Sequence, residues 1–380
     1  MYKLAFLLLT FLFIKCGEDK NNNASLVYTA AVGERFTTYV ELNKLKGIEV
    51  FNGDLWISCD EIKSLEMLES LTTINGNLEL HDNRLETLSG LENLRKVNSI
   101  SLSQNNHLKN IKALRKISEV KELNLSTNDK LISIAAFEAL TITEGISITG
   151  TALREIGENI TFKDSKVNDI SILSNENLRS VSFLKGIKKA KRIWIVNNSK
   201  LTIGKSLNML EIVDDFRIQN NASITFFETP RLMSINEYHI GENPKLTKII
   251  GGNFWLNPGK KVAITIELND KLQAIEGFNN LHRLELIVEA NNSLQSIEGF
   301  NSVDSIKLQI EENPKLYKLD MFHKSAFTNY DIGIFNNASL YNYCGLNKLL
   351  VTNLPDATID LKNNFYNPTK IKLLNGKCAR

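Results

Sequence analysis

Residues 216–224 read Phe-Arg-Ile-Gln-Asn-Asn-Ala-Ser-Ile, in which apolar and variable positions alternate before an asparagine, Asn221. The same nine-residue phrase returns at Ile193–Leu201, Tyr238–Leu246 and Leu308–Leu316. Side chains on a β-strand alternate between its two faces, so the first and third residues of the phrase would point to the interior. The phrase therefore predicts a short strand followed by a turn, repeated along the chain.

The phrase recurs thirteen times at nearly constant spacing. Each copy begins with an apolar residue about 23 residues after the previous one. The thirteen first residues are Leu55, Leu78, Ile100, Leu123, Ile146, Ile170, Ile193, Phe216, Tyr238, Ile264, Leu286, Leu308 and Ile332. A period of about 20–29 residues with a Leu-x-Leu-x-x-Asn phrase is typical of leucine-rich-repeat solenoids. The sequence therefore predicts a mainly β, right-handed repeat solenoid of about 13 turns.

The fifth residue after each start is asparagine in eleven of the thirteen copies, with Asp60 and Thr151 in the other two. The eleven are Asn83, Asn105, Asn128, Asn175, Asn198, Asn221, Asn243, Asn269, Asn291, Asn313 and Asn337. An inward asparagine can donate to and accept from backbone groups of its own and adjacent turns. We interpret these residues as a buried structural ladder, because each such bond contributes about 1 kcal/mol and each orphaned group costs about 1–3 kcal/mol.

The composition favours a folded protein without a nucleic-acid partner. Apolar residues make up 43% of the 380 and charged residues 23%, enough for a core, and the net charge is only +2. The five histidines are scattered, and no metal-binding spacing, nucleophile elbow or phosphate loop is present. The sequence therefore predicts a protein that is not an enzyme and has no cofactor and no metal site.

The N-terminus predicts export. Residues 1–15 form a short positive region and an apolar run of signal-peptide length. Phe13-Ile14-Lys15-Cys16 resembles a bacterial lipoprotein box, although Lys15 stands where a small residue is expected, and this resemblance implies a lipid on Cys16. The alternative is an ordinary cleaved signal. Residues 16–35 are interpreted as a lipidated flexible tether that holds the protein on a membrane.

The two ends of the repeat array are predicted to be capped, because terminal turns would otherwise expose core and strand edges. The predicted divisions are an N-terminal cap at 36–54, repeats at 55–343 and a C-terminal cap at 344–380. In the last of these we expect a degenerate fourteenth phrase at 358–364 and a short helix capped by Asn367. In an exported protein Cys344 and Cys378 are expected to pair, the alternative being two free thiols. Cys59 is interpreted as a small buried hydrophobe.

The C-terminal residues carry the most specific resemblance. Tyr343-Cys344-Gly345-Leu346, Tyr366-Asn367-Pro368-Thr369 and Gly376-Lys377-Cys378, after repeats such as Asn313-Pro314-Lys315-Leu316, resemble the leucine-rich-repeat, receptor-L-domain-like surface lipoproteins of Bacteroidetes bacteria. The resemblance covers about residues 36 to 380. It implies an outer-membrane or cell-surface location and no particular reaction.

The second and fourth residues of each phrase are expected to project from the sheet, one turn apart. In the middle of the chain they are large, and Trp194 with Arg217 are the best candidates for recognition because such side chains are typical binding anchors. The candidate ligand-binding residues are Arg192, Trp194, Arg217, Gln219 and His239. The alternative is that Trp194 only fills the surface between neighbouring turns.

Three glutamates, Glu267, Glu289 and Glu311, take the same outward position in successive turns. Like charges about 4.8 Å apart repel by roughly 1 kcal/mol in water. Such a column can be solvated, which is the default interpretation, or can hold a cation such as calcium. A hydrolytic site here is the remotest alternative.

The function predicted from the sequence is a non-catalytic, lipid-anchored binding or adhesion scaffold. Its exposed strand face would take a protein or glycan ligand, and the chain is expected to be a monomer. The alternative is a structural envelope lipoprotein without a dedicated ligand.

Overall fold

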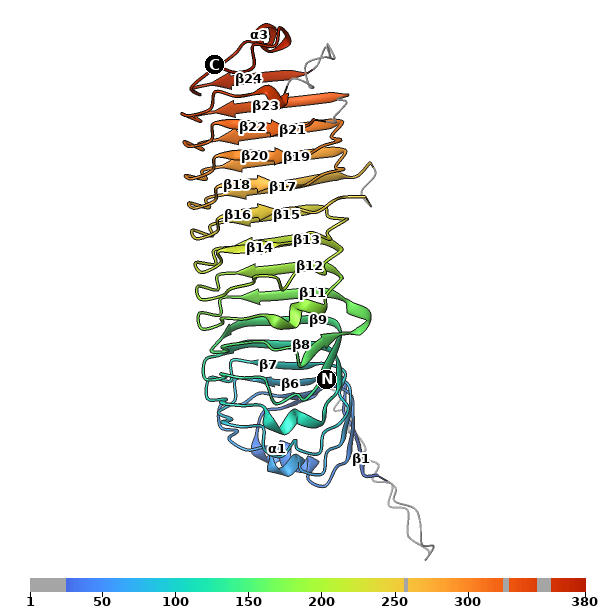
Figure 1. The fold of residues 1–380 in the computed structure, drawn as a ribbon. Coiled ribbons are helices and arrows are strands. Elements are labelled where there is room, and N and C mark those ends of the chain that lie inside the picture. Colours follow the sequence, from blue (N-terminus) through green and yellow to red (C-terminus); the bar gives the residue numbers. More distant parts are fainter. Residues whose placement is uncertain (1–24, 256–258, 324–327, 347–356) are drawn as a thin grey trace, which may run out of the picture.

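The computed structural model describes residues 25–255, 259–323, 328–346 and 357–380. Parallel strands stack along one axis into a mainly β solenoid of about 14 turns with a period of about 23 residues (Figure 1). The predicted solenoid is therefore confirmed. The turn beyond the thirteen full copies is the degenerate phrase, whose strand β24 (Thr358–Lys362) pairs in register with β23.

The main sheet has sixteen strands, and every pair in it is parallel. Its members in sheet order are β2 (Arg35–Phe36), β4 (Leu55–Ile57), β6 (Leu78–His81), β7 (Ile100–Ser103), β8 (Glu119–Asn128), β9 (Leu140–Thr151), β11 (Lys166–Leu173), β12 (Lys189–Val196), β13 (Ile212–Gln219), β15 (Glu237–Gly241), β17 (Lys261–Glu267), β19 (Arg283–Glu289), β21 (Ser305–Glu311), β23 (Asn329–Phe335) and β24, with β10 (Ile160–Phe162) paired to β9. The register aligns the predicted first residues, as in Ile193 opposite Phe216 and Phe216 opposite Tyr238.

The returning half of each turn differs between the two ends of the array. Near the N-terminus three strands form a small sheet, β1 (Val27–Thr29), β3 (Val50–Asn52) and β5 (Thr73–Asn75). Toward the C-terminus five strands form another, β14 (Phe226–Glu228), β16 (Lys248–Ile250), β18 (Ala274–Glu276), β20 (Ser296–Gly299) and β22 (Lys318–Met321). Between them the return is made by 3-10 turns, η3 (Lys112–Lys116) and η5 (Ser182–Gly186), while η2 (Glu66–Leu68) lies among the first turns and η4 (Lys163–Ser165) precedes β11.

The asparagine ladder is buried between the two halves of each turn. Asn221 is representative: its Oδ1 accepts from the backbone N–H of Asn198 at 3.0 Å, and its Nδ2 donates to the carbonyl of Ile195 at 2.8 Å. Where Thr151 replaces asparagine, its hydroxyl and its N–H both donate to Oδ1 of Asn175. The structural interpretation of the ladder is thus confirmed, since its amides bond to the scaffold itself.

A left-handed residue precedes every ladder position from Asn83 to Asn364. From Asp82 to Asn363 the residue just before the ladder has φ between 51° and 60° in every turn. This conformation costs roughly 1–2 kcal/mol in residues other than glycine and turns the next side chain into the interior. The first turn lacks it, so Cys59 rather than Asp60 occupies the ladder position, and the Cys59 N–H donates to Oδ1 of Asn83 at 3.1 Å. Asp60 is exposed and the thiol of Cys59 is free and half-buried.

The N-terminal cap is a short helix, α1 (Tyr39–Leu42), continued by η1 (Asn43–Leu45). Thr38 caps it by accepting from the N–H of Glu41, whose carboxylate accepts in return from Thr38. Folded structure nevertheless begins before the predicted boundary at residue 36, because β1 pairs with β3 and β2 with β4. Only the part of the predicted tether that precedes residue 25, with Cys16, lies outside the described residues.

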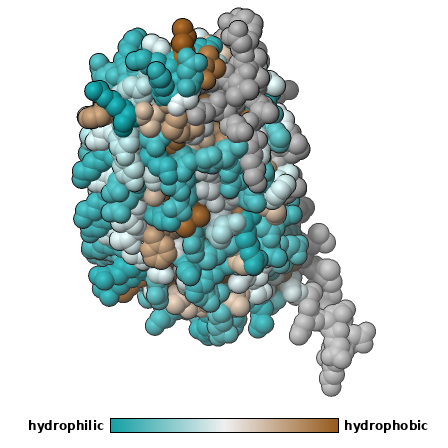
Figure 2. Space-filling model, turned by 45° about the horizontal axis from the view of Figure 1, so that its top comes forward, coloured by the Kyte–Doolittle hydropathy of each residue, from teal (hydrophilic) through white to brown (hydrophobic). Residues whose placement is uncertain are grey.

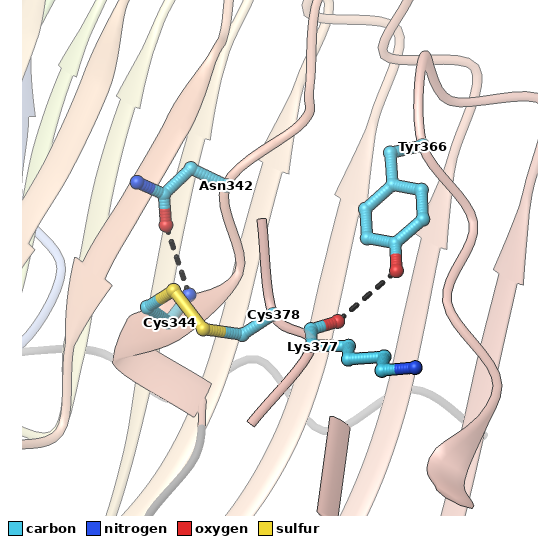
Figure 3. Close-up of a disulfide and its surroundings, with 5 residues drawn as sticks. All are labelled: Asn342, Cys344, Tyr366, Lys377 and Cys378. Atoms are coloured by element: carbon cyan, nitrogen blue, oxygen red, sulfur yellow. Dashed lines mark hydrogen bonds between the residues drawn. A yellow bond between two sulfur atoms is a disulfide. The ribbon is translucent and has the colours of Figure 1, made fainter. Parts of the chain in front are cut away.

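The C-terminal cap is held by the Cys344–Cys378 disulfide, which confirms the predicted pair (Figure 3). The bond joins η6 (Cys344–Leu346) to the end of the chain, and the Tyr366 hydroxyl donates to the carbonyl of Lys377 at 3.0 Å. The final helix, α3 (Lys370–Leu374), is capped by Thr369 and not by Asn367 as predicted. Asn367 instead ends the ladder, because its Oδ1 accepts from Asn364.

Candidate binding surface

The outer face of the main sheet brings three of the predicted recognition residues side by side. Trp194 on β12 is the register neighbour of Arg217 on β13, which in turn neighbours His239 on β15. All three side chains are only partly exposed, because each lies against the turn beside it. We call the surface formed by Arg192, Trp194, Arg217, Gln219 and His239 the central patch.

Two guanidinium groups lie near the indole ring of Trp194. Arg192 is 4.7 Å and Arg217 5.3 Å from the ring centroid, within the range of cation–π attraction. The indole Nε1 donates to Oδ2 of Asp215 at 2.8 Å, and Arg192 forms an ion pair with Asp169. The sequence-based alternative for Trp194 was surface filling. In the structure the ring does bond to Asp215 of the next turn, and it also lies near two cations on an outward face.

Gln219 and His239 make contacts across turns rather than projecting freely. Nε2 of Gln219 donates to Glu242 at 2.8 Å. The imidazole of His239 lies over Gly241, where a Cβ would stand 2.9 Å from its Nε2. This nitrogen is 3.2 Å from Glu267, close enough for an ion pair but not aligned as a hydrogen bond. Burial lowers the pKa of His239, with Glu267 opposing that shift and Arg217 adding to it.

The glutamate column is formed as predicted, with Glu267, Glu289 and Glu311 adjacent in register. Its two ends have partners: His239 lies beside Glu267, while Gln309 and Asn336 donate to Glu311. Glu289 lies between them, and burial together with the charges of Glu311 and Glu267 raises the pKa of its carboxyl. Within the described ranges, no group of three or more His, Cys, Asp and Glu side chains is placed to hold a metal ion.

Glu289→Gln is expected to raise the stability of the protein at neutral pH. A carboxyl with a raised pKa in the folded state destabilises that state once pH exceeds the folded pKa, and the penalty disappears below its ordinary pKa near 4.5. We expect a gain of about 0.5–1 kcal/mol at pH 7 that shrinks toward pH 4 and in high salt. Urea unfolding at pH 4 and pH 7 measures it. A gain that is equal at both pH values would contradict the charge explanation.

Two residues that bond to the central patch were not singled out from the sequence. Asp169 and Asp215 precede the first phrase residue on the strands that flank β12, and each anchors one side chain of the patch. The register Asp169–Arg192–Asp215 was already visible in the spacing of the repeats. The position of the His239 imidazole over Gly241 could not be seen in the spacing, because it depends on side-chain packing.

The comparisons with known proteins leave the family open. No protein-family model matches the chain, and no curated protein sequence is similar to it. In the described part of the chain, the helices are too short or too polar to cross a membrane.

Proposed function

We propose that this protein is a non-catalytic binding or adhesion module that captures a protein or glycan ligand on the outer face of its main sheet. One observation carries the proposal: the guanidinium groups of Arg192 and Arg217 both lie within cation–π distance of the Trp194 indole, while Asp169 bonds to Arg192 and Asp215 bonds to the indole. Tryptophan and arginine dominate the energetics of recognition surfaces. A ligand that meets them already ordered loses less entropy on binding.

The scaffold supports this function by its stiffness. Each strand of the central patch is paired on both sides, and the ladder residues Asn198 and Asn221, just past the ends of β12 and β13, bond to each other. Surface groups on such elements keep their mutual geometry, which is what precise recognition requires.

Export and lipid anchoring at Cys16 belong to the same proposal. The apolar run before Cys16 and the resemblance to Bacteroidetes surface lipoproteins support a location at the outer membrane or cell surface. The disulfide between Cys344 and Cys378 agrees with an oxidising compartment. A structural envelope protein without a ligand is the second candidate, and a cation site at the glutamate column is the third.

Replacing both Trp194 and Arg217 by alanine is expected to abolish ligand capture. The mature protein is screened on glycan and protein arrays, and the hits are titrated against the wild type and the double variant. Because Trp194 is partly buried, a small loss of stability is expected as well, so binding is measured well below the unfolding transition with folding checked by circular dichroism.

A matched control removes the same residue types elsewhere. Trp255 is 66% exposed and Arg231 is also exposed, and both lie outside the main sheet. Trp255→Ala with Arg231→Ala should leave binding intact. Undiminished capture by the Trp194/Arg217 variant would refute the assignment of the site, and the absence of any ligand on both arrays would favour the structural alternative.

A further inference from the structure

A local run of positive charge lies beside the central patch. Five of the eight residues from Lys185 to Arg192 are basic, although the whole chain is nearly neutral. All five are exposed, and Lys163 and Lys166 on the preceding turn are exposed as well. The run ends on β12, the strand that carries Trp194. The two features are therefore parts of one continuous surface.

Four of these lysines have no ion pair among the described residues. Lys163 pairs with Glu119, Lys185 with Glu158 and Arg192 with Asp169. The four others are Lys166, Lys188, Lys189 and Lys191. Lys166 and Lys189 are register neighbours on β11 and β12, a strand spacing of about 4.8 Å. Like charges at that spacing repel by roughly 1 kcal/mol even in water, so an anion bound between them would be stabilised.

A shallow hollow lies beside Lys163 and Lys166, where η4 leads into β11. It has a volume of about 240 Å³ and is lined by Thr143, Lys163, Asp164, Lys166, Val167 and Asn168. The turn η4 forms its rim, with Asp164 and Ser165 both in the left-handed conformation. This volume suits one small charged group rather than a large ligand. Asp164 is the single carboxylate in the lining.

The basic strip is narrow, and this limits what can bind to it. Glu122 and Glu144 lie on the strands before it, and Glu211 and Asp214 on the turn after it. The strip is thus about two turns wide, roughly 10 Å. A broad polyanion such as a nucleic-acid duplex would overlie these carboxylates. A thin chain crossing the solenoid along β12 would meet lysines first and then the indole of Trp194.

We propose that the ligand of this surface is an acidic polysaccharide, whose sulfate or carboxylate groups bind Lys166, Lys188 and Lys189 while a sugar ring packs near Trp194. The inference rests on the proposed function, which it narrows from protein or glycan to an anionic glycan. Ammonium groups act as point charges toward anions, so binding by these lysines is salt-dependent and tolerant of the exact anion.

Dextran sulfate and unmodified dextran of equal length are the probes, each immobilised and titrated with the mature protein. We expect binding to dextran sulfate that weakens steeply with salt, and weak or no binding to dextran. The variant Lys166→Gln/Lys188→Gln/Lys189→Gln should lose about tenfold or more in affinity. The control Lys245→Gln/Lys271→Gln/Lys315→Gln has the same net charge and removes exposed lysines from other turns, so it should change affinity less than about twofold.

The outcomes separate the two proposals. Equal binding of both dextrans, or equal losses in the two triple variants, would overturn the acidic-polysaccharide inference. If the Trp194/Arg217 variant then still loses a neutral glycan or a protein from the arrays, the proposed function stands without the inference. Tighter binding of duplex DNA than of dextran sulfate, lost in the Lys166 triple variant, would also overturn it.

Discussion

Asn291→Ala should destabilise the protein by about 3–5 kcal/mol. Oδ1 of Asn291 accepts from the N–H and the Nδ2 of Asn269, and its Nδ2 donates to the carbonyls of Ile266 and Glu289. The side chain is fully buried, so alanine removes these hydrogen bonds, leaves a void, and deprives the N–H of Asn269 of its acceptor; an orphaned buried group costs about 1–3 kcal/mol. Urea unfolding measures the loss, and hydrogen exchange should locate it in β17, β19 and β21.

The adjacent residue provides the control. Asn292 is exposed and its side chain donates to Asp270, which is itself at the surface, so Asn292→Ala should change stability by less than about 0.5 kcal/mol. Asn291→Asp keeps the volume of the side chain but turns an acceptor toward carbonyl oxygens, and we expect it to be at least as harmful as alanine at pH 7. A mild effect of both Asn291 variants would mean that the ladder does not stabilise the solenoid.

Removal of the disulfide by Cys344→Ala/Cys378→Ala should destabilise the C-terminal turns by about 2–4 kcal/mol. The bond closes a loop with a sequence separation of 34, and opening it restores conformational freedom to the unfolded segment. In a repeat array, neighbouring turns share stability while distant ones do not. Hydrogen exchange should therefore accelerate in β23 and β24 and stay unchanged in β12.

Reduction of the wild type should reproduce the effect, because no other disulfide is present in the described residues. Cys59→Ala serves as the control, since its thiol is free at the opposite end of the solenoid. Uniformly faster exchange along the whole array would show that the disulfide supports the entire fold. Unchanged exchange at β24 would show that α3 and the end of the ladder are sufficient as a cap.

Much of the fold could be predicted because each turn repeats the same local rule. Ile193, Phe216 and Tyr238 are different side chains, yet their common place in the phrase puts them opposite one another in the sheet. The two ends of the array were harder to predict, because each cap occurs once and its sequence cannot be compared with equivalent turns. Asn367 precedes Pro368 and therefore resembles a helix cap in the sequence. In the structure its Oδ1 instead accepts from the N–H and the Nδ2 of Asn364, the last asparagine of the ladder.

The candidate site could be predicted from the sequence only in part. Arg192, Trp194, Arg217, Gln219 and His239 could be placed on one face by counting residues. The contacts of these side chains could not be predicted, because Trp194 has a neighbouring strand on each side at the same spacing and its indole can lean toward either one. Whether His239 projects or folds down is decided by the missing side chain at Gly241, two residues further along the same strand.

The Cys344–Cys378 pair was an expectation for an exported protein, with two free thiols as the alternative, and the structure decided between them. The sequence by itself determined the solenoid, the register of its strands and the inward asparagines. These follow from periodicity and from the need of buried polar groups for partners, which act the same way in every turn. Only the tertiary structure showed that two arginines lie near the indole of Trp194 and that Lys163 and Lys166 line a hollow. Such contacts depend on the outward side chains of adjacent turns, and the repeat phrase does not specify the residue type at those outward positions.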